Sequence, residues 1–335
     1  MIAATIWEAV IKSIILILGL TLGFAYVTLY ERKVLARMQA RIGPNRAGWK
    51  GILQPIADAL KLIFKEDLIP DKADKIIFVL APVITVIPAL IITAVVPWGP
   101  DVTLFGRTIS LSIADINLAV LYILTVTSIS VYGITLAGWS SNNKYATLGG
   151  LRATAQMISY ELALAMAMLG PVLLAGSMSL KDIVDAQKNV WFIVYQPLGA
   201  LIYMIATIAE VNRAPFDMPE AEQELTAGYH VEYSGMKFAL FFMAEYIKMI
   251  AISMIGATLF LGGFQGPWVS THPWLGPIYL FIKVTILLFG LIWIRATWPR
   301  IRYDRLMAFG WKILFPLSVL NLFVTAVVAY LVGGK

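Results

Sequence analysis

The ionisable side chains that lie within long apolar stretches of this sequence are the residues most able to do chemistry. A charge at mid-bilayer costs roughly 2.5–3.5 kcal/mol on insertion scales, so such a residue usually faces a cavity or a charged partner. Burial and a neighbouring carboxylate both raise the pKa of an acidic side chain, which then carries protons near neutral pH. The residues of this kind are Asp115, Glu161, Glu210, Glu245, Lys248 and Lys283.

Three of the acids are predicted to lie at a similar depth. Glu161 is five residues beyond Gln156, at which we place the inner end of one apolar span, and Glu245 is seven residues into another. At ~1.5 Å per helical residue, both lie on the order of 10 Å from the inner surface. Glu210 stands at the inner end of the span between them. Lys248 follows Glu245 by three positions on one helix face, so the two can pair or exchange a proton.

These residues also have structural interpretations. Asp115 stands at the outer start of its span, where it caps a helix or meets water. Lys283 is expected to extend its ammonium outward to the membrane surface. A structural role is the alternative to proton transfer for Glu161 and Glu245, but the energetic penalty of burying acids on consecutive spans argues against it.

The loop over residues 212–237 is acidic, although it is predicted to lie on the positively charged face. A solvated acidic loop is the simplest interpretation. Against it, Pro215 and Phe216 begin a stiff, apolar stretch that suits packing against protein. An acidic funnel there would attract protons and supply them to the buried layer. The acids of this loop are Asp217, Glu220, Glu222, Glu224 and Glu232.

Two basic loops are predicted on the same face. One or two arginines in a loop are ordinary positive-inside anchors. A set of four favours bidentate pairing with carboxylates, for which the acidic loop is the expected partner. The first loop contains Arg32, Arg37, Arg41 and Arg46; the last contains Arg295, Arg300, Arg302 and Arg305 among aromatic residues, and is interpreted as an interfacial belt.

The first basic loop, residues 31–75, also contains an amphipathic segment. Leu53, Ile56 and Leu60 recur at helical spacing, while Asp58 and Lys61 occupy the other face. The segment is too short to span a bilayer, so we predict a helix in the membrane interface. It either anchors the loop or forms a lintel over a lateral opening for a lipid-like ligand.

The elements that must position these residues are membrane helices. The chain has 335 residues, of which 59% are hydrophobic and 14% charged, and no soluble fold buries so much apolar sequence. Stretches of ~20 residues can each cross a bilayer as a helix. We therefore predict an all-α polytopic bundle of about eight transmembrane helices in a single integral membrane domain over residues 1–335. The spans are placed near Ile6–Tyr30, Ile76–Pro97, Ile113–Gly138, Gln156–Ala175, Val190–Val211, Phe238–Leu261, Ile278–Thr297 and Phe309–Val332.

The distribution of positive charge predicts the orientation. Most of the 26 lysines and arginines fall in the loops after the first, third, fifth and seventh spans. By the positive-inside rule these loops face the cytoplasm, and both termini lie on the outer side. The first apolar run ends in charges without a small-residue cleavage site, so it is predicted to be a retained span rather than a signal peptide.

Composition excludes several kinds of site. The chain has no cysteine, which excludes disulfides and cysteine-held iron–sulfur clusters. His230 and His272 are its only histidines, too few for a histidine-ligated haem pair. Phosphate-binding and dinucleotide-binding fingerprints are missing. We therefore predict no metal, no redox cofactor, no catalytic redox group and no nucleic-acid partner for this chain.

Four separated stretches together resemble the quinone-proximal membrane subunit of proton-translocating NADH:quinone oxidoreductase, respiratory complex I, known in bacteria as the H subunit. The resemblance runs from about Tyr30 to Leu317, and each stretch is long and chemically unusual for a membrane protein. They read ERKVLARMQARIGPN, GWSSNNKYATLGGLRATAQMISYEL, AEVNRAPFDMPEAEQELTAGYHVEYSGMKFALFFMAEY and IRATWPRIRYDRLM.

This resemblance implies a translocase subunit of the bacterial plasma (inner) membrane, with both termini periplasmic. Quinone, such as ubiquinone, would be the substrate and would reach its site from the bilayer through a tunnel. Iron–sulfur clusters, FMN and NADH would be bound by partner subunits. The implied partners are soluble-arm iron–sulfur and quinone-site subunits, small membrane subunits, antiporter-like pump subunits and membrane lipid.

The resemblance also implies roles for particular residues. A buried run of glutamates would relay protons or charge toward the pump subunits. Lys248 is added to this relay because it lies three positions after Glu245 on the same helix face. The implied relay consists of Glu161, Glu210 and Glu245, with Asp217, Glu220, Glu222 and Glu224 connecting it to the quinone cavity. The implied quinone-tunnel or heel contacts are Glu31, Arg32, Arg37, Arg46 and Phe216.

Three other functions compete with this one. A homologous membrane subunit of a hydrogenase or of a ferredoxin-linked dehydrogenase would take electrons from another donor, but the complete PFDMPEAEQEL segment favours quinone. A stand-alone proton- or cation-coupled transporter would need paired broken helices in two related halves, which the sequence does not show. A purely structural heel would not need buried carboxylates.

Overall fold

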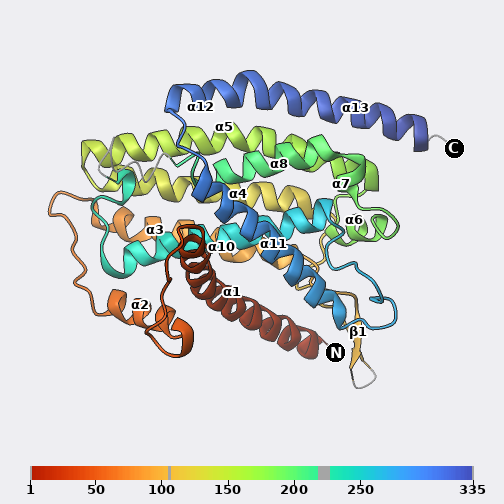
Figure 1. The fold of residues 1–335 in the computed structure, drawn as a ribbon, viewed down its shortest axis with the longest axis horizontal. Helices are drawn as coiled ribbons and strands as arrows, with labels where there is room; N and C mark the ends of the chain where they lie inside the picture. The colour runs from red at the N-terminus through yellow and green to blue at the C-terminus, as the bar shows by residue number, and fades with distance from the viewer. Residues whose placement is uncertain (1, 105–106, 218–226, 334–335) are drawn as a thin grey trace.

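The computed structural model describes residues 2–104, 107–217 and 227–333. In this part of the chain, seven helices are long and apolar enough to cross a membrane. They pack side by side in a bundle, with α1 and α11 inclined to the others (Figure 1), so the predicted all-α membrane fold is confirmed. The long helices are α1 (Ile2–Met38), α3 (Lys75–Ile91), α4 (Ala119–Ser140), α5 (Lys144–Ala175), α10 (Gly235–Phe260), α11 (Leu275–Thr297) and α13 (Phe315–Gly333).

Shorter elements connect them. A small antiparallel hairpin pairs β1 (Val102–Leu104) with β2 (Arg107–Ile109), with Thr103 opposite Thr108. The α13 helix continues a helical run that begins in α12 and passes through a π-helical turn, η4. The remaining short elements are η1 (Trp49–Gly51), α2 (Gln54–Ile63), η2 (Ile92–Val95), α6 (Leu180–Ala186), α7 (Phe192–Tyr195), α8 (Pro197–Glu210), η3 (Gly228–His230), α12 (Tyr303–Phe309) and η4 (Gly310–Leu314).

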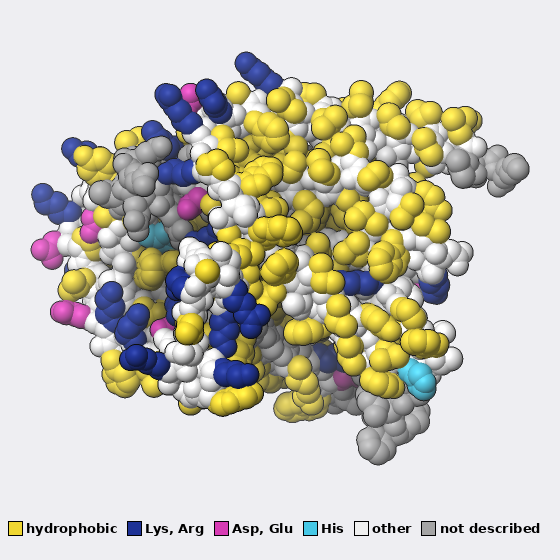
Figure 2. Space-filling view, viewed as in Figure 1, with side chains coloured by type: hydrophobic (Ala, Val, Ile, Leu, Met, Phe, Trp, Pro, Cys, Tyr) yellow, Lys and Arg dark blue, Asp and Glu magenta, His cyan; other side chains and the backbone are white. Residues whose placement is uncertain are grey.

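Helix α10 forms the centre of the bundle. In its most apolar stretch 67% of residues are buried, against 11% in α1, which lies at one edge. Helices α1, α3 and α11 all contact α10, while α13 lies along α5 at the opposite edge (Figure 1). Large apolar side chains remain exposed on the outer helices, as Figure 2 shows, because lipid rather than water covers them.

Local sequence explains where several helices begin and end. Asp74 caps α3 by accepting a hydrogen bond from the backbone N–H of Ile77 at 3.4 Å, and Asn143 does the same for α5 through Tyr145 at 2.9 Å. Helix α5 ends at Gly176, whose φ of 68° places it in the left-handed region that favours glycine.

The fifth predicted span, Val190–Val211, is wrong as a continuous helix. The chain forms α7, breaks at Gln196 and continues as α8, which has 14 residues. At 1.5 Å per residue, α8 alone is roughly 21 Å long, shorter than ~30 Å of hydrocarbon, so this segment consists of two helical pieces rather than one full-length span. The break has a local cause, because the residue before a proline is disfavoured in the helical region and Pro197 begins the new helix.

Other predicted boundaries also shift. Helix α1 continues past Tyr30 to Met38, and α5 begins at Lys144 rather than at Gln156. The third span begins at Ala119, six residues later than predicted. Hydropathy locates the part of a helix that lies in lipid, whereas hydrogen bonding continues into water for as long as the backbone allows.

The two ends of the bundle differ in charge. The start of α1 and the end of α13 lie at one end, and α2 lies at the other (Figure 1). Lysine and arginine side chains gather around the α2 end (Figure 2). The described ends of the chain therefore both lie at the end of the bundle away from this positive charge.

The amphipathic segment forms α2 and has no buried residue. Ile56 is 55% exposed and Phe64, just beyond the helix, is 83% exposed. An apolar face so open to solvent suits a helix that lies in the membrane interface.

Candidate functional site

A buried ionic network joins three long helices. Arg213, just beyond α8, contacts Glu245 of α10 through Nε, and its Nη1 lies 3.5 Å from Oε1 of Glu31 on α1. The Glu31 carboxylate also pairs with Arg295 of α11. The Arg213 and Glu31 side chains are only 7% and 4% exposed. Breaking such a pair would leave an uncompensated buried charge, so each member fixes the position of the others.

Arg213 remains charged within this network. Burial opposes the charged form, but Glu245 and Glu31 outweigh it and hold the pKa of the guanidinium above its usual value. The guanidinium carbon lies 4.4 Å from the centroid of the Tyr246 ring, a cation–π contact. Arg213 therefore acts as a fixed positive centre between two carboxylates.

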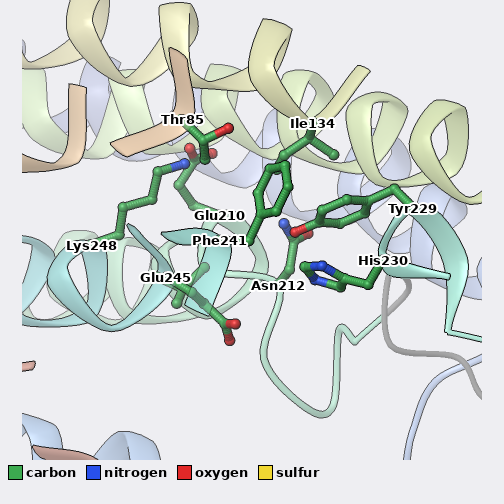
Figure 3. Close-up of a pocket in the computed structure, with 10 residues that line it drawn as sticks. Thr85, Ile134, Glu210, Asn212, Tyr229, His230, Phe241, Glu245 and Lys248 are labelled. Atoms are coloured by element: carbon green, nitrogen blue, oxygen red, sulfur yellow. The ribbon is translucent and has the colours of Figure 1, made fainter. Parts of the chain in front are cut away.

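A second buried cluster lies beside the first on α10. Glu210, the last residue of α8, is 1% exposed, and Lys248 is 6% exposed. Figure 3 shows the Lys248 side chain extending toward the Glu210 carboxylate. Lys248 is attracted electrostatically to Glu210, Glu245 and Glu161. Neither carboxylate oxygen of Glu210 has a hydrogen-bond partner in the part of the chain that the structure describes.

Glu161 completes the layer from α5. Its carboxylate accepts a hydrogen bond from the hydroxyl of Ser128 on α4. One turn earlier, the Gln156 side chain donates to the carbonyls of Ala209 at 2.9 Å and Phe216 at 2.7 Å. This contact holds the end of α8 against α5, so the three predicted acids are brought together around Lys248.

A small pocket extends from this cluster toward the loop of residues 212–237. It leaves about 20 Å³ in which the centre of a water molecule fits, enough for roughly one ordered water. Glu210, Glu245 and Lys248 line one end (Figure 3), and Asn212 and His230 line the other. The site thus combines ionisable groups with a polar cavity.

A larger, apolar groove runs beside the ionic network. It encloses about 450 Å³ between α1, α10 and α11. Tyr30 and Ile250 line it, and the adjacent residues Glu31 and Met249 line a smaller pocket that also contains Arg295. The apolar groove therefore approaches the charged cluster along the same three helices.

The predicted tunnel and heel residues have different environments. Glu31 is buried in the network, whereas Arg32 is half exposed and pairs with Asp58 of α2 at 2.6 Å. Arg37 and Arg46 are exposed. The pairing expected for the four arginines therefore holds for Arg32, but with an acid of the same loop.

Phe216 is buried but does not line the α1–α10–α11 groove. Its ring packs 5.4 Å from that of Tyr160, and it lines a separate apolar groove of about 670 Å³ bordered by α8 and α11. Asp217 is partly buried and is engaged in an interaction. Glu220, Glu222 and Glu224 lie outside the described residues.

Two structural expectations are settled by the contacts. Lys283 does not extend to the surface: its ammonium donates to the carbonyls of Leu261, Gly263 and Gln265 at 2.6–2.8 Å. Lys283 therefore binds the carbonyls just beyond the C-terminus of α10. The C-terminal end of a helix carries partial negative charge, so it favours a cation there. Asp115 precedes α4, is exposed and accepts a 3.4 Å hydrogen bond from Ser179.

Sequence reasoning missed the central roles of Arg213 and Arg295. Both follow an apolar run, so the positive-inside rule explained them as surface anchors. Their pairing with Glu31 required knowing that α1 and α11 both pack on α10. His230 was also missed, because a single histidine in a loop has no characteristic spacing.

Comparison with known proteins identifies the family to which this sequence belongs. Residues 11–326 match the family described as NADH dehydrogenase. The chain belongs to this family. Among NADH dehydrogenase family members, it is 51% identical to the H subunit of the NADH-quinone oxidoreductase of Syntrophotalea carbinolica over 318 residues, covering 93% of this chain and 95% of that protein. It is 48% identical to the corresponding H subunit of Thermomicrobium roseum over 336 residues, with 96% and 97% coverage.

Proposed function

We propose that this chain is the H subunit of a proton-translocating NADH-quinone oxidoreductase, in which it admits quinone from the bilayer and couples quinone reduction to proton movement. The observation that carries this proposal is the apolar groove of α1, α10 and α11, which approaches the buried Glu31–Arg213–Arg295 cluster. Its partners are redox subunits on the cytoplasmic side and pumping subunits within the plasma membrane. The named relatives support the assignment.

The groove and the cluster suit the two ends of a quinone. An isoprenoid tail is apolar and enters a lipid-facing groove without desolvating any polar group. The head group gains electron density when electrons arrive from a partner's cluster, and Arg213 and Arg295 are cations fixed nearby. Positive charge held in place stabilises the developing anion until protons neutralise it.

Glu245 connects quinone chemistry to the proton path. It contacts Arg213 on one side and lies three residues from Lys248 on the other. A change in charge at the quinone head alters the field at Arg213, and this shifts the proton affinity of Glu245. Lys248, Glu210 and Glu161 then respond in turn, because charges in a low-dielectric interior interact strongly.

Neutralising the carboxylates tests the proposal. We expect Glu245→Gln and Glu161→Gln to lower quinone-linked proton pumping in inverted membrane vesicles by about a hundredfold or more, because a positioned proton-transfer group typically contributes ~10²–10⁴-fold to a rate. NADH oxidation by ferricyanide, which bypasses quinone, should be unchanged because the complex still assembles. Glu8→Gln is the matched control, since Glu8 is an exposed acid paired with Lys12 on α1. Full pumping by both the Glu245→Gln and the Glu161→Gln variant would overturn the relay.

Electron donor identity separates this function from a hydrogenase or ferredoxin-linked assembly. The tagged chain can be isolated from native membranes in mild detergent together with its partners. Reduction of a quinone analogue by NADH, blocked by quinone-site inhibitors, is the expected result. Activity with hydrogen or ferredoxin alone would assign the chain to the other assemblies, and isolation of the chain by itself would favour a transporter.

A further inference from the structure

His230 is a buried polar side chain to which the proposed relay gives no role. It lies in η3, on the loop that joins α8 to α10, and is 7% exposed. Aromatic rings surround it: the Tyr229 ring centroid is 3.9 Å away, and those of Phe238 and Phe241 are 5.5 and 5.4 Å away. Packing of this kind fixes the ring orientation of the imidazole.

The imidazole has an unused hydrogen-bonding atom. Nδ1 of His230 is buried and has no partner among the described residues. Burial lowers the pKa of His230 to about 3, so the ring is neutral at physiological pH and keeps one nitrogen as an acceptor. A buried acceptor without a partner is unfavourable unless water reaches it.

The pocket offers a place for such a water. His230 and Asn212 line its loop end, while Glu210 and Lys248 line its membrane end (Figure 3). Both carboxylate oxygens of Glu210 also lack a hydrogen-bond partner in the described chain. Unpaired polar atoms at both ends and space for about one water meet the requirements for ordered internal water.

We propose that His230 is a positioning residue that holds an ordered water in this pocket and so connects the loop of residues 212–237 to the Lys248–Glu210 pair. This inference rests on the proposed proton-coupling function and adds to it the point at which protons pass from the loop to the buried cluster. His230 acts through the hydrogen bond at Nδ1, which orients the water, while protons move through water and the carboxylate. The imidazole itself stays neutral.

Three variants of the intact complex test the role of Nδ1. His230→Phe fills the aromatic cage but removes both nitrogens. His230→Asn places an amide close to the position of Nδ1, so it retains a hydrogen-bonding atom without an imidazole. His272→Phe is the control, because His272 is exposed in the loop before α11. Inverted vesicles report NADH-driven proton pumping through the native quinone pool, and ferricyanide reduction reports assembly.

We expect His230→Phe to lower proton pumping about tenfold at unchanged ferricyanide reduction, which corresponds to the loss of one oriented hydrogen bond in the path. His230→Asn should restore most of the pumping, and His272→Phe should match the parent complex. Normal pumping by His230→Phe, or equal loss in the Phe and Asn variants, would overturn the inference. If His230→Phe pumps normally while Glu245→Gln does not, only this inference fails; if Glu245→Gln and Glu161→Gln also pump normally, the relay itself fails.

Discussion

Two buried lysines show that residue type and depth alone do not assign a role. Lys248 extends toward the Glu210 carboxylate, an ionisable partner with which it can exchange a proton. Lys283 instead donates to three backbone carbonyls beyond the end of α10 and lies over the Trp191 ring at 4.7 Å. Carbonyls cannot accept a proton at physiological pH, so Lys283 holds the chain in place while Lys248 is free to take part in chemistry.

The structural role of Lys283 gives the first prediction at this scale. Lys283→Met removes three charge-assisted hydrogen bonds and leaves buried carbonyls unpaired. Because each hydrogen bond to a charged group contributes about 1.5–3 kcal/mol, we expect a marked loss of thermal stability in the purified complex. Lys181→Met is the control, since its pair with Asp101 is exposed and such pairs contribute at most ~1 kcal/mol. Equal stability of the two variants, measured by thermal unfolding in detergent, would contradict the assignment.

Sequence patterns identified the acids of the site but not its arginines. Glu161, Glu210 and Glu245 could be identified individually, because an acid in an apolar run is uncommon enough to indicate function. Arginines at the end of an apolar run are common. Nothing in the sequence therefore distinguished Arg213, which pairs with two buried acids, from Arg302, which remains exposed.

At the scale of elements, the close approach of two helices shapes the pocket beside the acids. Helices α3 and α4 pack directly against each other, and Gly133 of α4 lies close to α3. A Cβ there would lie 2.1 Å from the Thr85 hydroxyl and 2.9 Å from the carbonyl oxygen of Ala81. Thr85 also lines the pocket beside Lys248 and Glu210. The spacing of these two helices therefore sets the shape of the pocket.

This contact gives a prediction for the elements. Gly133→Ala must push α3 away, because two of the three clashing atoms, the Ala81 carbonyl oxygen and the Thr85 nitrogen, are backbone atoms; overpacking of this kind typically costs about 1–3 kcal/mol. We expect lower thermal stability and weaker proton pumping. Gly290→Ala on α11 is the matched control, since no atom lies within 4 Å of its added Cβ. Stability and pumping should be unchanged in the control, and a normal Gly133→Ala variant would show that α3 and α4 can separate freely.

For the whole molecule, the charge difference between the two ends sets the orientation. The α2 end carries most of the visible lysine and arginine, and the described chain ends lie at the other end (Figures 1 and 2). The positive-inside rule predicts that the α2 end faces the cytoplasm. The ionic network would then open toward the side on which the proposed redox partners lie.

Orientation can be tested directly because the chain has no cysteine. Single cysteines can replace Lys188, 60% exposed beyond α6, and Arg302, 78% exposed before α12. A membrane-impermeant maleimide should label the Lys188→Cys variant in intact spheroplasts and the Arg302→Cys variant only in inverted vesicles. The reverse pattern would invert the assigned orientation.

The sequence alone determined the class of fold, most of the spans and the acids. Apolar runs of bilayer length have only one low-energy form in lipid, a helix, so hydropathy predicts most of the long helices. Local chemistry also left visible marks, such as Asp74 and Asn143 at helix starts. The break at Pro197 was equally visible in the sequence, but the length of the surrounding apolar run outweighed it in the prediction.

Only the tertiary structure decided which charges meet. Glu31, Arg213, Glu245 and Arg295 come from four separate segments, and their contacts depend on α1 and α11 packing on α10. Helix packing in a membrane depends on side-chain shape and small residues at contacts rather than on apolarity, because lipid-facing surfaces are as apolar as most of the surfaces between helices. For that reason the ionic network, the adjoining groove and the environment of His230 became apparent only in three dimensions.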